Sequence, residues 1–116
     1  KQLEDYIIFI SLLKQPKRIS CLKEMFLTKR IALYGAGGFG QAIFANFGEQ
    51  IPVWVDANSQ RYQEENISVY PVEMLLEQQA LYDIIFIAIL NADICKSIKK
   101  DLMVCGIKKP ILFFAR

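Results

Sequence analysis

A glycine-rich segment constrains the fold of this chain more than any other feature of its sequence. It reads GAGGFG over residues 35–40 and follows a short apolar run at residues 30–34. Gly35, Gly37 and Gly40 match the pattern G-x-G-x-x-G, in which a strand turns sharply into a helix. Residues 38–47 then show the apolar spacing of a helix. The sequence therefore predicts a strand, a tight turn and a helix in direct succession.

The same glycines predict an anion site. Gly35 permits the tight turn, Gly37 leaves room for a phosphate near the backbone, and Gly40 lets the helix pack closely against the first strand. Unpaired amides at a helix N-terminus favour negative charge. We expect five consecutive backbone amides to hold a diphosphate, those of Ala36, Gly37, Gly38, Phe39 and Gly40. The alternative is a strand–helix turn without a ligand.

Predicted strands and helices alternate along the rest of the domain. Strands are expected at residues 30–34, 51–56, 67–70, 82–90 and 108–114; helices are expected at 38–47, 71–79 and 91–106, with a polar loop at 57–66. Pro71 is expected to open its helix, Asn91 to cap the last helix and Gly106 to end it. This alternation predicts an α/β fold, a Rossmann-like parallel sheet in the order 3-2-1-4-5.

Residues 1–29 follow a different pattern from residues 30–116. Apolar residues recur at helical spacing on both sides of Pro16, which predicts two short helices around a turn. We therefore expect a helical extension at 1–29 and a Rossmann-like nucleotide-binding domain at 30–116. The extension would pack on this domain, on a second copy in a homodimer or on a missing catalytic domain. A chain that starts with Lys1 is expected to be a piece of a longer protein.

Asp56 is the second part of the predicted site. It ends the second predicted strand about twenty residues after the glycine turn, as the dinucleotide-binding fingerprint requires. Its carboxylate would bind ribose hydroxyls or a base and repel a 2′-phosphate, although Arg61 nearby weakens that exclusion. The alternative is a solvated strand end. Ala88, Leu90 and Asn91 should line the far side of the crevice, with Asn91 acting more as a helix cap than as a ligand contact.

No familiar set of catalytic residues occurs in the sequence. Without any histidine, the commonest general base is missing and a structural zinc site is disfavoured. The patterns Tyr-x-x-x-Lys, G-x-S-x-G and G-x-x-x-x-G-K-[ST] do not occur either. Tyr62, Glu64 and Glu65 are interpreted as surface residues of the polar loop. We expect no catalytic residue and no metal in this chain.

Composition narrows the partners and the compartment. A hydrophobic share of 53% excludes a disordered chain, and a net charge of +2 without a basic face argues against nucleic-acid binding. No apolar run is long enough to span a bilayer, and an amphipathic anchor would need a basic face. Cys21, Cys95 and Cys105 form no C-x-x-C pair and are expected as buried thiols in a reducing cytoplasm.

Four segments of the sequence together resemble a known family. They read IALYGAGGFGQAIFANF, VWVDAN, ISVYPVEMLL and YDIIFIAI, and the resemblance covers residues 30–114. It is a resemblance to the small N-terminal Rossmann-like, nucleotide-sugar-binding domain of bacterial sugar acetyltransferases of the sialic acid and bacillosamine type. Similar domains accompany FkbM-type methyltransferases and some sugar-processing glycosyltransferases.

The resemblance implies that Gly35, Gly37, Gly38 and Asp56 hold the UDP part of a nucleotide sugar. Two departures from the family pattern limit this inference. Phe39 stands where the family often has histidine. The β-helical acetyltransferase domain with its catalytic histidine is absent, so this chain by itself is not expected to acetylate a substrate.

These observations give one leading hypothesis and two alternatives. The leading one is a non-catalytic nucleotide-binding module of a sugar-modifying or polysaccharide-biosynthesis protein, with a UDP-sugar as the favoured ligand. The first alternative is the NAD-binding domain of an oxidoreductase, which rests on the same turn and Asp56. The second is an interaction domain with an empty glycine turn, in which the N-terminal helices dimerise.

Overall fold

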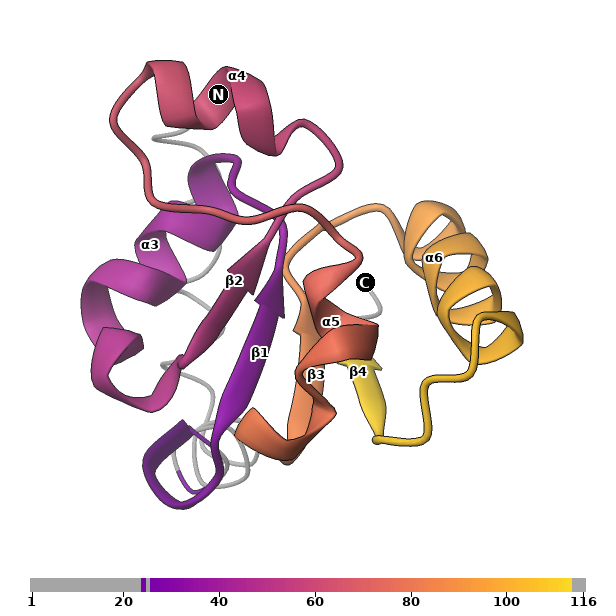
Figure 1. The fold of residues 1–116 in the computed structure, drawn as a ribbon. Helices are drawn as coiled ribbons and strands as arrows, with labels where there is room; N and C mark the ends of the chain where they lie inside the picture. The colour runs from indigo at the N-terminus through magenta and orange to yellow at the C-terminus, as the bar shows by residue number, and fades with distance from the viewer. Residues whose placement is uncertain (1–23, 25, 114–116) are drawn as a thin grey trace.

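A parallel sheet lies between two layers of helices in the computed structural model, which describes residues 24 and 26–113 (Figure 1). The strands are β1 (Ile31–Tyr34), β2 (Val53–Val55), β3 (Ile84–Ile87) and β4 (Ile111–Phe113). The helices are α3 (Gly38–Phe47), α4 (Ser59–Glu64), α5 (Met74–Glu77) and α6 (Ala92–Val104), with short 3₁₀ segments at Gly48–Gln50 and Gln79–Leu81. The predicted α/β class with a parallel sheet is confirmed.

The strand order is β2-β1-β3-β4, with every neighbouring pair parallel. The predicted five-strand order 3-2-1-4-5 is not reproduced, because residues 67–70 form no strand. They make one isolated parallel bridge between Tyr70 and Val55. Pro71 follows immediately, and a proline has no N–H to continue a ladder of hydrogen bonds. Pairing along the outer edge of β2 therefore stops after a single bridge.

Two further predictions on secondary structure are wrong. The expected polar loop at 57–66 contains the helix α4, because Ser59 and Tyr62 lie three positions apart and both turn inward. The expected helix at 71–79 begins only at Met74, so Pro71 precedes it rather than opening it. By contrast, α3 has the predicted bounds 38–47, and α6 lies within the predicted 91–106.

Alternating side chains of the strands fill two separate apolar layers. Ile31, Leu33 and Phe86 face α3, whereas Ala32, Ile85 and Ile87 face α5 and α6. All six are at most 2% exposed. Central strands buried on both faces explain why the chain shows continuous apolar runs at β1 and β3 rather than alternation with polar residues.

Most of the predicted N-terminal extension, including the first helix, Pro16 and Cys21, lies outside the described residues. Its last part is described at residue 24 and at 26–28, which are helical. Phe26 is fully buried; its ring stacks on Phe47 at 4.7 Å between centroids and meets the Phe86 ring at 5.5 Å. This end of the extension therefore packs on the α3 face of the sheet.

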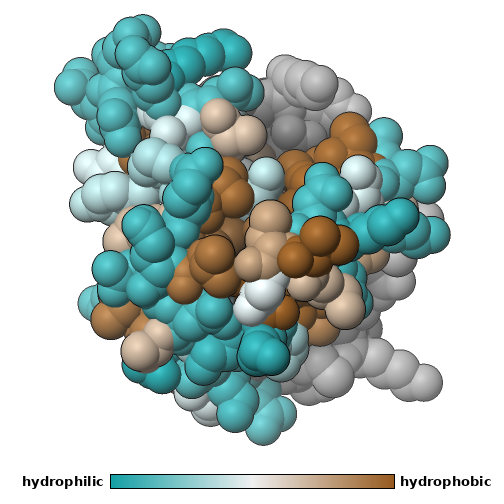
Figure 2. Space-filling model, turned by 45° about the vertical axis from the view of Figure 1, so that its right-hand side comes forward, coloured by the Kyte–Doolittle hydropathy of each residue, from teal (hydrophilic) through white to brown (hydrophobic). Residues whose placement is uncertain are grey.

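The opposite helical layer leaves some apolar side chains at the surface. Leu76 of α5 and Met103 and Val104 of α6 are 45%, 59% and 80% exposed. Figure 2 shows apolar side chains reaching the surface among polar ones on the side of the molecule that carries these helices. Among the described residues, no helix combines the length and the apolar character that crossing a membrane requires.

Candidate functional site

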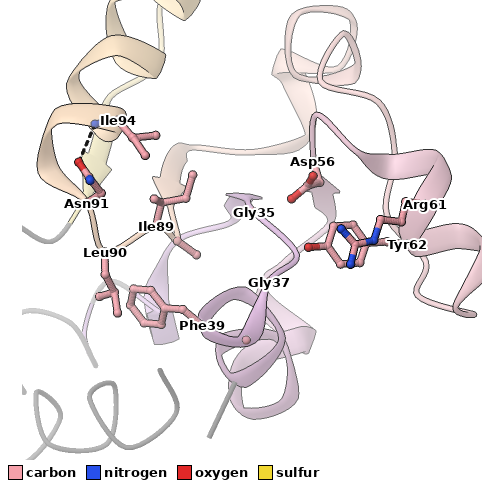
Figure 3. A pocket seen from close by; sticks show the side chains of 12 residues that line it. Gly35, Gly37, Phe39, Asp56, Arg61, Tyr62, Ile89, Leu90, Asn91 and Ile94 are labelled. Atoms are coloured by element: carbon pink, nitrogen blue, oxygen red, sulfur yellow. Dashed lines mark hydrogen bonds between the residues drawn. The ribbon is translucent and has the colours of Figure 1, made fainter. Parts of the chain in front are cut away.

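The candidate site is a cleft of about 730 Å³ at the carboxyl ends of the central strands. It lies between the glycine turn, α4 and the connection from β3 to α6 (Figure 3). Its lining contains eight of the predicted residues: Gly35, Gly37, Gly38, Phe39, Asp56, Ala88, Leu90 and Asn91. Ala36 and Gly40, also predicted, do not line it and are buried beneath the turn.

Gly35 and Gly40 are required by the fold itself. Gly35 has a φ of +120°, a conformation that side chains rarely adopt, and its amide donates to the Val55 carbonyl at 2.8 Å. A Cβ on Gly40 would lie 2.0 Å from the Gly35 carbonyl oxygen, far inside contact distance. These two glycines bring α3 against the end of β1, as the sequence pattern predicts.

Gly37 differs from both, because nothing in the fold requires a glycine there. A Cβ at this position would meet no atom within 4 Å. The residue occupies the cap position of α3 with φ −73° and ψ −168°, a conformation open to other residues. The absent side chain leaves open space on the cleft side, which is the property expected where a ligand approaches the backbone.

The predicted row of five amides is shorter in the structure. The Ala36 amide is not available, because it donates to Asp56 Oδ2 at 2.8 Å. The amides of Gly37 and Gly38 make no hydrogen bond to any part of the chain that the structure describes, and both residues line the cleft. We therefore confine the candidate anion site to the amides of these two residues at the start of α3.

The turn is held in this shape by side chains from outside it. Trp54 Nε1 donates to the Gly35 carbonyl at 2.8 Å, and Gln41 Nε2 donates to the Ala36 carbonyl at 2.8 Å. These bonds satisfy the carbonyl groups of Gly35 and Ala36 within the protein. The amides of Gly37 and Gly38 are therefore positioned before any ligand arrives, which lowers the entropic cost of binding.

Asp56 has a structural role that the sequence did not indicate. Its Oδ2 accepts from the Ala36 amide at 2.8 Å, and its Oδ1 accepts from the Asn58 amide at 2.7 Å. The carboxylate thus ties the glycine turn to the segment that leads into α4. It also lines the cleft, but both of its oxygens already accept a backbone hydrogen bond.

Arg61 and Tyr62 of α4 belong to the cleft, although Tyr62 was predicted to be a surface residue. The Arg61 guanidinium lies 5.8 Å from the centre of the Tyr62 ring and 3.6 Å from Glu65 in a largely exposed pair. Burial raises the pKa of Tyr62, and the negative charge of Asp56 raises it further, so its hydroxyl stays a neutral donor. The spacing of Ser59 and Tyr62 after a strand was the signal that could have indicated this helix.

The far wall comes from the β3–α6 connection, as predicted. The Ala88 amide donates to the Tyr34 carbonyl at 2.8 Å, which keeps the ends of β3 and β1 together. Asn91 caps α6, since its Oδ1 accepts from the Ile94 amide at 3.1 Å. The predicted cap is therefore confirmed. Ile89 and Ile94 also line the cleft, and the sequence did not single them out.

The cysteines described by the structure differ in their surroundings. Cys95 is buried, its Sγ donates to the Ile89 carbonyl at 3.1 Å, and burial raises the pKa of its thiol. Cys105 is exposed, so the prediction that it is buried is wrong. It lies directly after the last turn of α6, where none of the described elements covers it. Within residues 24 and 26–113, no cluster of three or more carboxylates and thiols could hold a metal ion.

Comparison with known proteins gives no match to this chain. Models of protein families, curated protein sequences and solved structures were each searched, and none of the three comparisons found a similar protein. The functional interpretation therefore rests on the geometry of the cleft and on the sequence patterns that predict it.

Proposed function

We propose that this chain is a non-catalytic nucleotide-binding module that holds phosphate at the start of α3. The observation that carries the proposal is the pair of amides at Gly37 and Gly38, which open onto the cleft without a partner in the described chain. The Ala36 amide and the Gly35 carbonyl beside them are paired. An anion with several oxygens would satisfy both open donors.

The size and charge of the cleft support this proposal. A volume of about 730 Å³ is within the range typical of small-molecule sites, roughly 300–1,000 Å³. The first turn of α3 carries no acidic residue, so its partial positive charge is not neutralised from within the helix. Arg61 adds a full positive charge at the rim, and the two amides bonded to Asp56 partly offset the negative charge of that carboxylate.

The sequence resemblance makes a UDP-sugar the first ligand to test, in a protein of sugar modification or polysaccharide synthesis. The geometry by itself does not separate UDP from NAD, because both would use Asp56 as the acceptor for ribose hydroxyls. Both oxygens of Asp56 already accept backbone amides. We keep NAD in the test because a carboxylate oxygen has a second lone pair.

The test is a thermal-shift screen of the chain with UDP, UDP-sugars, NAD, AMP and coenzyme A, followed by calorimetric titration. A ligand at about one hundred times its Kd raises the free energy of unfolding by about 2.7 kcal/mol, which is readily measured. We expect a shift with UDP or UDP-sugars. A shift with NAD alone would favour the oxidoreductase alternative. No shift with any compound, together with a concentration-dependent dimer, would favour an interaction domain.

Gly37→Val localises the binding. The first added carbon meets no atom of the described chain, so the variant should fold, while its side chain fills the space in front of the amides. We expect at least about a tenfold loss of affinity, the equivalent of one charge-assisted hydrogen bond. Gly48→Ala, at the other end of α3, is the matched control and should bind normally. Unchanged binding by a folded Gly37→Val variant would refute the proposed site.

A further inference from the structure

The two ends of the cleft differ in chemical character. Asp56, Arg61 and the Tyr62 hydroxyl lie on one side of Gly37 (Figure 3). The other side is apolar, and Figure 3 shows its side chains grouped around the β3–α6 connection. It is formed by Phe39, Ile89, Leu90 and Ile94. The amides of Gly37 and Gly38 lie between the two ends.

The apolar end is short of side-chain hydrogen-bond partners. Asn91 is the polar side chain among the lining residues there; its Oδ1 already accepts from the Ile94 amide, which leaves its Nδ2 as a donor. Ile94 faces the cleft and is 47% exposed. Apolar surface in contact with water is unfavourable, and a bound apolar group would cover it. A hydroxyl placed at this end would lose its hydrogen bonds to water and regain few from the protein, which is unfavourable.

We propose that the nucleotide bound here carries an apolar group, an alkyl or acyl chain, beyond its phosphates. The inference rests on the proposed function, because it assumes that phosphate occupies the amides of Gly37 and Gly38. The nucleoside then lies toward Asp56 and Tyr62, and the apolar group lies against Leu90 and Ile94. A hydroxyl-rich sugar in that position is the alternative that the test distinguishes.

The test compares three probes in each of two nucleotide series by calorimetry on the full chain. The probes are UDP, UDP-glucose and the hexyl ester of UDP, together with ADP, ADP-glucose and the hexyl ester of ADP. In the series that binds, we expect the hexyl ester to bind about tenfold more tightly than the diphosphate. The glucose compound should bind no more tightly than the diphosphate.

Two cleft variants and one matched control locate the preference. Ile94→Gln should reduce the advantage of the hexyl ester to less than about threefold while leaving the affinity for the diphosphate unchanged. Leu90→Gln is the second variant should the first fold poorly. Leu112→Gln changes a side chain that is 42% exposed on β4, outside the cleft, and should keep the full advantage.

The outcomes separate the two proposals. Binding of the glucose compound as tight as that of the hexyl ester would overturn this inference and leave the proposed function standing. A hexyl advantage that survives both Ile94→Gln and Leu90→Gln would also overturn it. If no compound of either series binds, the proposed function fails and the inference fails with it.

Discussion

Two strand–helix connections face each other across the cleft, and they treat their helix N-termini differently. In the β3–α6 connection, Asn91 caps the helix by accepting from the Ile94 amide at 3.1 Å. In the β1–α3 connection, Gly37 occupies the cap position, and α3 has no side-chain cap. One helix end is closed by the protein's own side chain, whereas the other presents open amides to the cleft.

The difference indicates where the protein gives up stability. A cap by Asn, Asp, Ser or Thr is worth about 1 kcal/mol over alanine and a few tenths of a kcal/mol over glycine, and such a residue would fit the open space at Gly37. The backbone at Gly37 is not strained. A helix end without a side-chain cap at this position agrees with the binding role proposed above.

The largest expected effect separates the two kinds of glycine within the β1–α3 turn. Gly40→Ala should destabilise the fold by about 3 kcal/mol or more, because its Cβ would lie 2.0 Å from the Gly35 carbonyl oxygen. Gly37→Ala should change the free energy of unfolding by less than about 1 kcal/mol. Urea denaturation measures both variants. Equal losses would contradict the distinction between a packing glycine and an open one.

A smaller effect is expected from exchanging the caps. Asn91→Ala should lower the free energy of unfolding by about 1 kcal/mol, through loss of the hydrogen bond to the Ile94 amide. Gly37→Asn should raise it by a few tenths of a kcal/mol through a hydrogen bond to an amide of the first helical turn. It should also weaken nucleotide binding, since the new side chain fills the open space in front of the Gly37 and Gly38 amides. Denaturation and calorimetry on both variants provide the measurements. A stabilised Gly37→Asn that binds nucleotide as well as before would show that the open cap serves no ligand.

The smallest effect concerns the opposite ends of the same two strands, where Arg30 and Asp83 form an ion pair at 3.0 Å. The hydrogen bonds from Arg30 lower the pKa of Asp83 to about 2. A depressed carboxyl pKa contributes stability above the unfolded pKa, near 4, and loses it as the pH falls toward 2. Asp83→Asn should therefore flatten the acid dependence of stability between about pH 4 and pH 2.

Arg30→Gln is the matched variant for this ion pair, because it removes the hydrogen bonds that lower the pKa of Asp83. It should flatten the same dependence of stability on acid pH. The pair is largely exposed, so the effect at neutral pH is small. Both variants should leave binding at the cleft unchanged. If stability depends on acid pH in both variants as it does in the unchanged protein, this pair does not link β1 and β3 in solution. If binding at the cleft changes, the two turns depend on the far ends of their strands.

Several features of the fold were predictable from neighbouring residues alone. The bounds of α3, the cap at Asn91 and the positive φ of Gly106 after α6 follow from signals within a few positions along the chain. The glycine pattern also predicted the close packing at Gly40. These features depend on backbone conformation and local hydrogen bonds, which short stretches of sequence encode.

Other features depend on residues that meet only after folding. The bond between Asp56 and the Ala36 amide joins residues 20 positions apart, and no local pattern specifies it. The burial of Tyr62 and its place in the cleft require α4 to pack beyond the ends of the strands. The loss of strand pairing at 67–70 reflects the edge of a sheet whose register the sequence does not display.

The sequence by itself determined that a glycine turn joins a buried strand to a helix, because G-x-G-x-x-G after an apolar run leaves the backbone few other conformations. Only the tertiary structure decided which amides remain open, since Asp56, Trp54 and Gln41 reach the turn from other elements and satisfy part of it. Hydrogen bonds between distant segments form where packing brings donors and acceptors together, and packing is a property of the whole fold.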